Sequence, residues 1–141
     1  MRRYTNSGLC RLLEIHGVLQ SVNSLKDSES DQYKSLVSKY ERLVDVIRDD
    51  HIAAARSHIQ DEAIASRLAK DIETECKEIQ EYRLAVERWH LEIDSRSKDR
   101  LVSFGEKLSC RFVAALLQDR VGYNEHFNCA VLTIYIIGSR R

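Results

Sequence analysis

A glycine followed by a carboxylate, near the start of a predicted helix, is the feature of this sequence that most suggests a ligand-binding site. Gly105 and Glu106 lie in an amphipathic stretch that runs from Leu101 to Arg120. A glycine inside a helix costs about 1 kcal/mol relative to alanine, so Gly105 indicates close approach by a ligand or another backbone. A carboxylate beside that gap could hold a cationic group, such as the amine of a substrate.

Glu106 also has a simpler interpretation. A glutamate in the first half of a helix interacts favourably with the helix dipole, and exposed charges are common on protein surfaces. Ser103 and Ser109 flank Glu106 at helical spacing. Their hydroxyls could contact a ligand, although solvent-facing hydroxyls, or hydroxyls bonded back to the helix, are the more frequent arrangement.

Other kinds of site have weaker support in the sequence. His51 and His58 are seven residues apart, whereas the H-E-x-x-H zinc motif needs two histidines at i and i+4. The adjacent Asp49, Asp50 and His51 point in different directions if they lie on a helix. The five glycines are all isolated, so none forms a glycine-rich phosphate loop. We therefore predict no catalytic residue, no metal site and no ATP-binding group within this chain.

The composition is that of a helical, water-soluble chain of one domain or a piece of a larger one. The 141 residues include 22 basic and 22 acidic side chains, which argues against a nucleic-acid or anionic-membrane binder. Proline is absent, which favours long uninterrupted helices. The four cysteines form no C-x-x-C pair, as expected of reduced thiols in the cytoplasm. The apolar stretch Ala130 to Gly138 is too short to cross a bilayer.

The hydrophobic periodicity predicts four helices, each with one apolar stripe. They cover residues 7–22, 31–58, 61–91 and from about 97 to 120 or 122, with a loop at 23–30 and a turn at 94–97. Ser97 is a candidate N-cap, and Ser28 with Asp31 resembles a capping box. Residues 131–137 are rich in β-branched side chains and are the one strand candidate. The fold class is therefore mostly α, with one C-terminal strand candidate.

The first of these helices is predicted to pack through one leucine-rich face. The residues that share this face by helical spacing are Leu9, Leu12, Leu13, His16 and Leu19 or Gln20.

Three segments together resemble aspartate kinases, particularly those of fungi. They are Val46-Ile47-Arg48-Asp49-Asp50-His51-Ile52, then Ser103-Phe104-Gly105-Glu106-Lys107-Leu108-Ser109-Cys110, and Arg11-Leu12-Leu13 near the start. The second of these matches the S-x-G-E-x-x-S pattern of the family. The resemblance covers roughly residues 7–120. We interpret residues 1–120 as a partial amino-acid kinase domain and 121–141 as an unmatched tail.

The resemblance implies the helical part of an α/β/α amino-acid kinase fold. Aspartate kinases transfer the γ-phosphoryl group of MgATP to the side-chain carboxylate of L-aspartate, the first step towards threonine, methionine and isoleucine. In that family the glutamate of the S-x-G-E pattern contacts the bound aspartate, and here it falls on Glu106. The resemblance thus implies ATP and Mg²⁺ as cofactors and L-aspartate as the substrate, and leaves a homo-oligomer open.

The sequence also departs from the family pattern. It has no Lys-Phe-Gly-Gly-Thr-Ser strand, whose lysine and glycines handle the phosphates, and Gly8 and Leu9 replace a threonine pair. We therefore expect the chain alone to be inactive as a kinase. The alternative function is a non-enzymatic helical interaction module, in which the helices from Asp31 to Leu91 pair as a hairpin.

Overall fold

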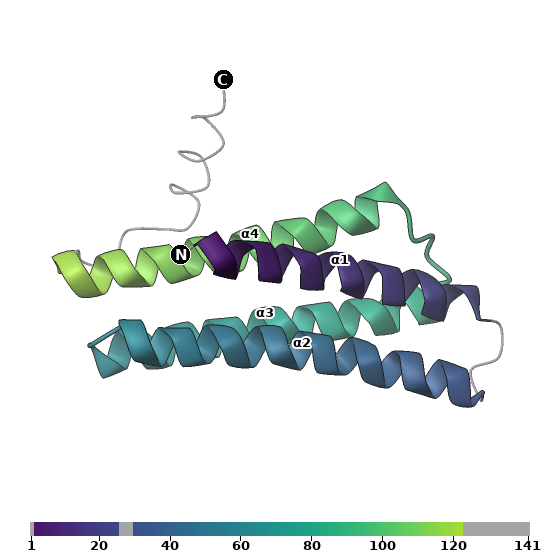
Figure 1. Ribbon diagram of the computed structural model, residues 1–141, viewed down its shortest axis with the longest axis horizontal. Coiled ribbons are helices and arrows are strands. Elements are labelled where there is room, and N and C mark those ends of the chain that lie inside the picture. The colour runs from purple at the N-terminus through teal and green to yellow at the C-terminus, as the bar shows by residue number, and fades with distance from the viewer. Residues whose placement is uncertain (1, 26–29, 123–141) are drawn as a thin grey trace, which may run out of the picture.

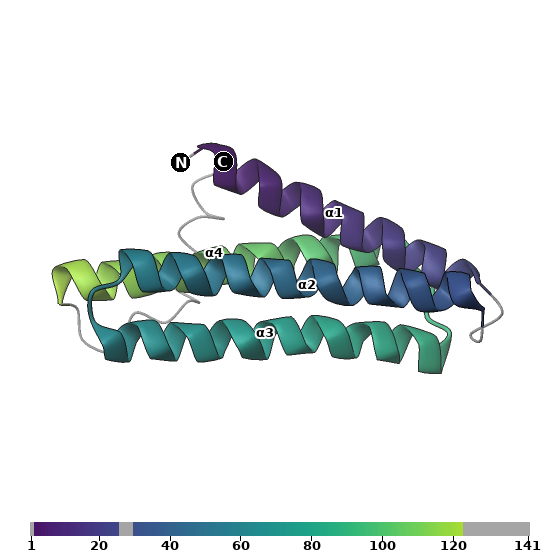
Figure 2. The same ribbon diagram turned by 60° about the horizontal axis from the view of Figure 1, so that its bottom comes forward.

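The computed structural model describes residues 2–25 and 30–122 and shows an elongated bundle of helices. Consecutive helices run in opposite directions (Figure 1). In chain order the helices are α1 (Arg2–Ser24), α2 (Asp31–His58), α3 (Glu62–Trp89) and α4 (Ser95–Val121). The pairs α1 with α2, α2 with α3, α3 with α4 and α4 with α1 are in contact, and Figure 2 shows α1 inclined to the other three. The prediction of a mostly α fold is confirmed for the described residues.

Side-chain caps fix the starts of three helices. Ser30 accepts a hydrogen bond from the Tyr33 amide at 3.1 Å, and Asp61 accepts from the Ala63 amide at 2.8 Å. Asp94 accepts from the Arg96 amide at 2.9 Å and begins α4. Each cap satisfies amide groups that have no partner inside the helix. The starts of these helices are therefore determined by residues close by in the sequence.

The N-cap of α4 differs from the one predicted from the sequence. The prediction that Ser97 caps α4 is wrong, because Asp94 holds that place and Ser97 lies buried inside the helix. Its hydroxyl accepts a hydrogen bond from the Tyr82 hydroxyl at 3.0 Å, which ties α4 to α3. The proposed cap at Ser28 and the strand candidate at 131–137 lie outside the described residues.

The core runs along the axis of the bundle and is lined by all four helices. Cys76 lies in this core, where burial raises the pKa of its thiol to about 12. Its most deeply buried large side chains are Ile15, Leu19, Tyr40, Val44, Ile72, Val86, Leu101 and Leu108. None of the helices in the described ranges is long and apolar enough to cross a membrane.

The predicted packing face of α1 is wrong in part. Leu9 and Leu13 are 47% and 41% exposed, while Ile15 and Val22 are buried in the core. Two apolar stripes overlap on this helix, and the one that includes Leu12 has more large aliphatic side chains at a spacing of three and four residues. That stripe faces inward because it buries more apolar surface, and Leu9 and Leu13 remain on the outside.

Candidate functional site

The three segments that resemble aspartate kinases lie side by side in the fold, with the segment of α1 in contact with the other two. The Arg11 guanidinium of α1 pairs with the Asp50 carboxylate of α2. The neighbouring Leu12 packs on Gly105 of α4, where a Cβ atom would lie only 2.5 Å from its Cδ1 atom. Segments that are far apart in the chain are therefore neighbours in space, and Arg11 and Leu12 join them.

Gly105 is explained by helix packing. The sequence predicted close approach by a ligand or another backbone, and the group that approaches is the side chain of Leu12. Because glycine has no Cβ, α1 and α4 can come together at this point without a clash. Gly105 therefore requires no ligand to account for it.

Glu106 lies on the outer side of α4, away from the core, and is exposed. Val113 lies seven residues further along the helix and Leu117 eleven, so both share this face, and both are exposed large apolar side chains. Within the described ranges, no side chain forms a hydrogen bond or ion pair with the Glu106 carboxylate. The carboxylate is thus available to a cation on an otherwise partly apolar surface.

A cluster of charged residues joins α4 to α3 next to Glu106. Glu75 of α3 is only 3% exposed, and its two carboxylate oxygens contact Lys107 Nζ at 2.6 Å and Arg111 Nη2 at 2.8 Å. Arg111 also pairs with Asp71 at 3.2 Å. This cluster was not predicted from the sequence, although the sequence contains its pattern: acidic residues at i and i+4 on one helix and basic residues at i and i+4 on another.

The two serines that flank Glu106 lie in different surroundings. Ser109 donates a hydrogen bond to the Gly105 carbonyl oxygen at 3.0 Å, which is the bond back to the helix considered from the sequence. Ser103 lines an open groove between α3 and α4, together with Glu78, Arg100 and Lys107. The Arg100 guanidinium lies over the Tyr82 ring, 4.5 Å from its centre.

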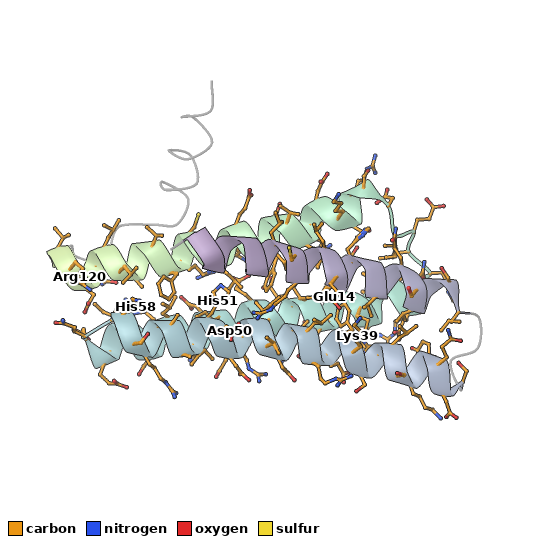
Figure 3. All side chains as sticks on the ribbon, viewed as in Figure 1. Glu14, Lys39, Asp50, His51, His58 and Arg120 are labelled. Atoms are coloured by element: carbon orange, nitrogen blue, oxygen red, sulfur yellow. The ribbon has the colours of Figure 1, made fainter. Side chains whose placement is uncertain are left out.

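Two ion pairs link α1 to α2 at the surface, Arg11 with Asp50 and Glu14 with Lys39. Glu14 of α1 and Lys39 of α2 point toward one another (Figure 3), with 2.8 Å between the charged atoms. Asp50 faces α1, whereas Asp49 pairs with Arg48 of its own helix at 3.0 Å. The adjacent acidic residues thus diverge, as expected from helical geometry, and do not form a joint cation site.

The histidines of α2 bond to their own helix. His51 Nδ1 lies 2.7 Å from the Ile47 carbonyl oxygen, and His58 Nδ1 lies 2.9 Å from that of Ala54. Figure 3 shows the two histidines at separate places along α2. In the part of the chain that the structure describes, no three histidine, cysteine or acidic side chains come together in a metal-binding group.

Asp119, near the end of α4, holds the turn between α2 and α3. Its carboxylate accepts hydrogen bonds from the backbone amides of Asp61 at 2.8 Å and Gln60 at 3.1 Å. These two bonds lower the pKa of Asp119, the bond from Asp61 most strongly. The Asp119 carboxylate thus links the end of α4 to the start of α3, where the helix dipole also favours negative charge.

We expect this contact to make the stability of the bundle pH-dependent. Because the pKa of Asp119 is lower in the folded chain than the ordinary value of 3.8, its contribution is complete above that value and disappears as the pH falls through the folded pKa. The Asp119→Asn variant should have a lower Tm at neutral pH and a smaller drop in Tm between about pH 5 and about pH 3. Thermal unfolding followed by circular dichroism measures both.

The matched control is Asp99→Asn, an exposed position on the same helix. It should leave the Tm and its pH dependence close to those of the unsubstituted chain. Equal acid sensitivity of the Asp119→Asn variant and the unsubstituted chain would show that the contact does not contribute to stability.

Aspartate kinases of fungi are among the known proteins that this chain resembles. The chain is 34% identical over 110 residues to an aspartate kinase of Gibberella moniliformis. The matched segment covers 78% of this chain and 21% of that protein. It is 41% identical over 78 residues to an aspartokinase of Schizosaccharomyces pombe, 55% of this chain and 15% of that protein. It is also 37% identical over 83 residues to an aspartokinase of Saccharomyces cerevisiae, 59% of this chain and 16% of that protein.

The extent of these matches bears on the candidate site. The chain spans about a fifth of the length of the Gibberella relative. A match of 110 residues in a chain of 141 must include residues 32–110, and therefore both Glu75 and Glu106. No family model and no solved structure matches the chain.

Proposed function

Since this chain is homologous to part of the fungal aspartate kinases, we propose that it forms the helical part of such an enzyme and one wall of its L-aspartate pocket. The enzyme transfers the γ-phosphoryl group of MgATP to the side-chain carboxylate of L-aspartate, on the route to threonine, methionine and isoleucine. Glu106 receives the ammonium group of the substrate, which leaves the reacting carboxylate free to face the nucleotide.

The position of Glu106 supports this proposal. Its carboxylate is exposed on the outer face of α4, and no described side chain neutralises it. A charged hydrogen bond between an ammonium group and a carboxylate is roughly twice as strong as a neutral one. The partly apolar surface along Val113 and Leu117 would exclude water once it is covered, which strengthens that bond further.

The residues present do not fit ATP and Mg²⁺. The glycines of this sequence are isolated, so none provides the run of backbone amides that cradles phosphates, and the described residues form no acidic cluster for a cation. We therefore assign nucleotide binding to other parts of an aspartate kinase. The 141-residue chain by itself should release no ADP in response to L-aspartate, and aspartate-dependent turnover by this chain would overturn that assignment.

A chimaeric enzyme tests the role of Glu106. Residues 2–122 of this chain would replace the equivalent segment of the Gibberella aspartate kinase. In that enzyme, Glu106→Gln should raise the KM for L-aspartate about tenfold to a hundredfold, because a hydrogen bond to a charged group contributes about 1.5–3 kcal/mol and 1.4 kcal/mol is tenfold. The KM for ATP should stay within about twofold, since the substitution changes no nucleotide contact.

The control for this experiment is Asp99→Asn, which removes a carboxylate two turns earlier on the same face of α4. The substitution equivalent to Glu106→Gln, made at the aligned position of the Gibberella enzyme, extends the test to a fully native background. An unchanged KM for L-aspartate in both backgrounds would refute the assignment of Glu106.

The second candidate function is a non-enzymatic interaction module. The hairpin proposed for it exists as α2 and α3, but its apolar side is covered by α1 and α4. What favours this alternative is the set of large apolar side chains left exposed on α1 and α4, namely Leu9, Leu13, Val113, Leu117 and Val121. Sedimentation of the 141-residue chain distinguishes the two functions, because only the module requires a concentration-dependent assembly.

A further inference from the structure

The charged cluster between α3 and α4 lies close to Glu106 along the chain. We propose that Glu75 is a positioning residue, which fixes the rotation of α4 about its own axis and so determines the direction in which Glu106 points. This inference rests on the proposed function, because Glu106 is taken as the substrate contact. It concerns a residue on a different helix that does not itself touch the substrate.

The geometry of the cluster is that of a clamp. The two oxygens of the buried Glu75 carboxylate bind two cations that lie one turn apart on α4, Lys107 at 2.6 Å and Arg111 at 2.8 Å. Arg111 in turn bridges two carboxylates one turn apart on α3, Glu75 and Asp71. A rotation of α4 would move both cations away from the Glu75 oxygens together, so the clamp resists that rotation.

A second contact acts on the opposite side of α4. Successive residues of an α-helix are 100° apart, so Gly105 and Lys107 lie on either side of Glu106. Gly105 packs against Leu12 of α1, and Lys107 pairs with Glu75 of α3. With α4 in contact with both α1 and α3, these two contacts leave Glu106 facing outward between them.

The cluster is poorly suited to stabilising the fold. Removing a carboxylate from water has a large free-energy cost, and apolar replacements of buried ion pairs are often neutral or stabilising. Arg111 Nε is also buried and makes no hydrogen bond to any described residue, and such an orphaned donor costs about 1–3 kcal/mol. An arrangement with these costs is better explained by the orientation that it imposes.

A triple substitution separates orientation from stability. In the 141-residue chain, Glu75→Met, Lys107→Met and Arg111→Met together remove the buried carboxylate and the two cations that it binds, while keeping side chains of similar length. Only the more exposed Asp71 and Glu78 carboxylates of the cluster keep their charge. We expect urea unfolding to show stability that is unchanged or higher. The nuclear Overhauser effect between the Gly105 Hα protons and the Leu12 methyl groups should weaken, because α4 is free to turn. An undiminished effect at this contact would overturn the proposal, whatever the substrate.

The same triple variant in the chimaeric kinase tests the consequence for the substrate. The KM for L-aspartate should rise about tenfold to a hundredfold, because a misplacement of about 1 Å can cost a hundredfold, and the KM for ATP should stay within about twofold. The matched control is Glu87→Gln, which breaks an ion pair with the buried Arg83 at 2.5 Å on α3 without touching α4. It should lower the stability and leave the KM for L-aspartate unchanged.

The outcomes distinguish this inference from the proposed function. If Glu106→Gln raises the KM for L-aspartate and the triple variant does not, Glu75 has no positioning role. If Glu106→Gln itself has no effect on that KM, the proposed function fails, and with it the link from Glu75 to the substrate.

Discussion

The Gly105→Ala variant should lower the free energy of unfolding by about 1 kcal/mol, although alanine is the better helix former. The new Cβ would lie 2.5 Å from Cδ1 of the buried Leu12, and overpacking of this kind costs about 1–3 kcal/mol. The higher helix propensity of alanine returns about 1 kcal/mol. Because the clash is the larger of the two effects, the sign is destabilising. Urea unfolding followed by circular dichroism measures it.

A double-mutant cycle identifies the cause. In a Leu12→Ala background the clash is absent, so Gly105→Ala should stabilise by about 1 kcal/mol, which gives a coupling energy of about 2 kcal/mol between the two positions. Gly17→Ala is the control, because a Cβ at Gly17 would have no neighbour within 4 Å. It should stabilise by about 1 kcal/mol. Additive effects at positions 12 and 105 would refute the contact.

Substitutions of Tyr40 should have the largest effect on stability. Its side chain is 0% exposed, and its hydroxyl donates a hydrogen bond to the Ile79 carbonyl oxygen at 2.7 Å, from α2 to α3. Tyr40→Phe should cost about 1 kcal/mol for the lost hydrogen bond. Tyr40→Ala should cost about 3–5 kcal/mol, because it opens a cavity in the core. Packing, more than the hydrogen bond, is the main contribution of this residue.

The same denaturation measurement checks these values. Val46→Ala on the exposed side of α2 is the control and should change the stability by no more than about 0.5 kcal/mol. The phenylalanine variant remains measurable if the alanine variant does not fold, since domains have only about 5–15 kcal/mol of stability in total. A cost for Tyr40→Phe close to that for Tyr40→Ala would show that the hydrogen bond dominates.

The helices could be predicted from the sequence because their signals are local. The predicted range of α2, residues 31–58, agrees with the structure at both ends, and Asp61 precedes α3 as expected. Prediction was wrong where two local signals compete. Asp94 and Ser97 are both good caps, and the chain uses the first. The two apolar stripes of α1 overlap, and only contact with α2 and α4 decides which one is buried.

The candidate site could be predicted only in part. Gly105 and Glu106 stand out in the sequence because a helical glycine has a cost, and the structure explains Gly105 by its contact with Leu12. The role of Glu106 stays a prediction. Glu75 was not predicted, because acidic pairs such as Asp71 with Glu75 resemble the ordinary surface charges of an amphipathic helix. It becomes conspicuous only when Lys107 and Arg111 are seen beside it.

The helices of this protein, the likeness of its three segments to fungal aspartate kinases and the unusual glycine inside a helix at Gly105 can all be recognised from the sequence. These properties depend on spacing and on residue types within one or two helical turns. Three contacts become visible only in the folded chain: Leu12 packs beside Gly105, Arg11 pairs with Asp50, and Glu75 pairs with Lys107 of α4. Such contacts join residues some 30 to 90 positions apart, and they form because whole helices pack together, which no local sequence pattern records.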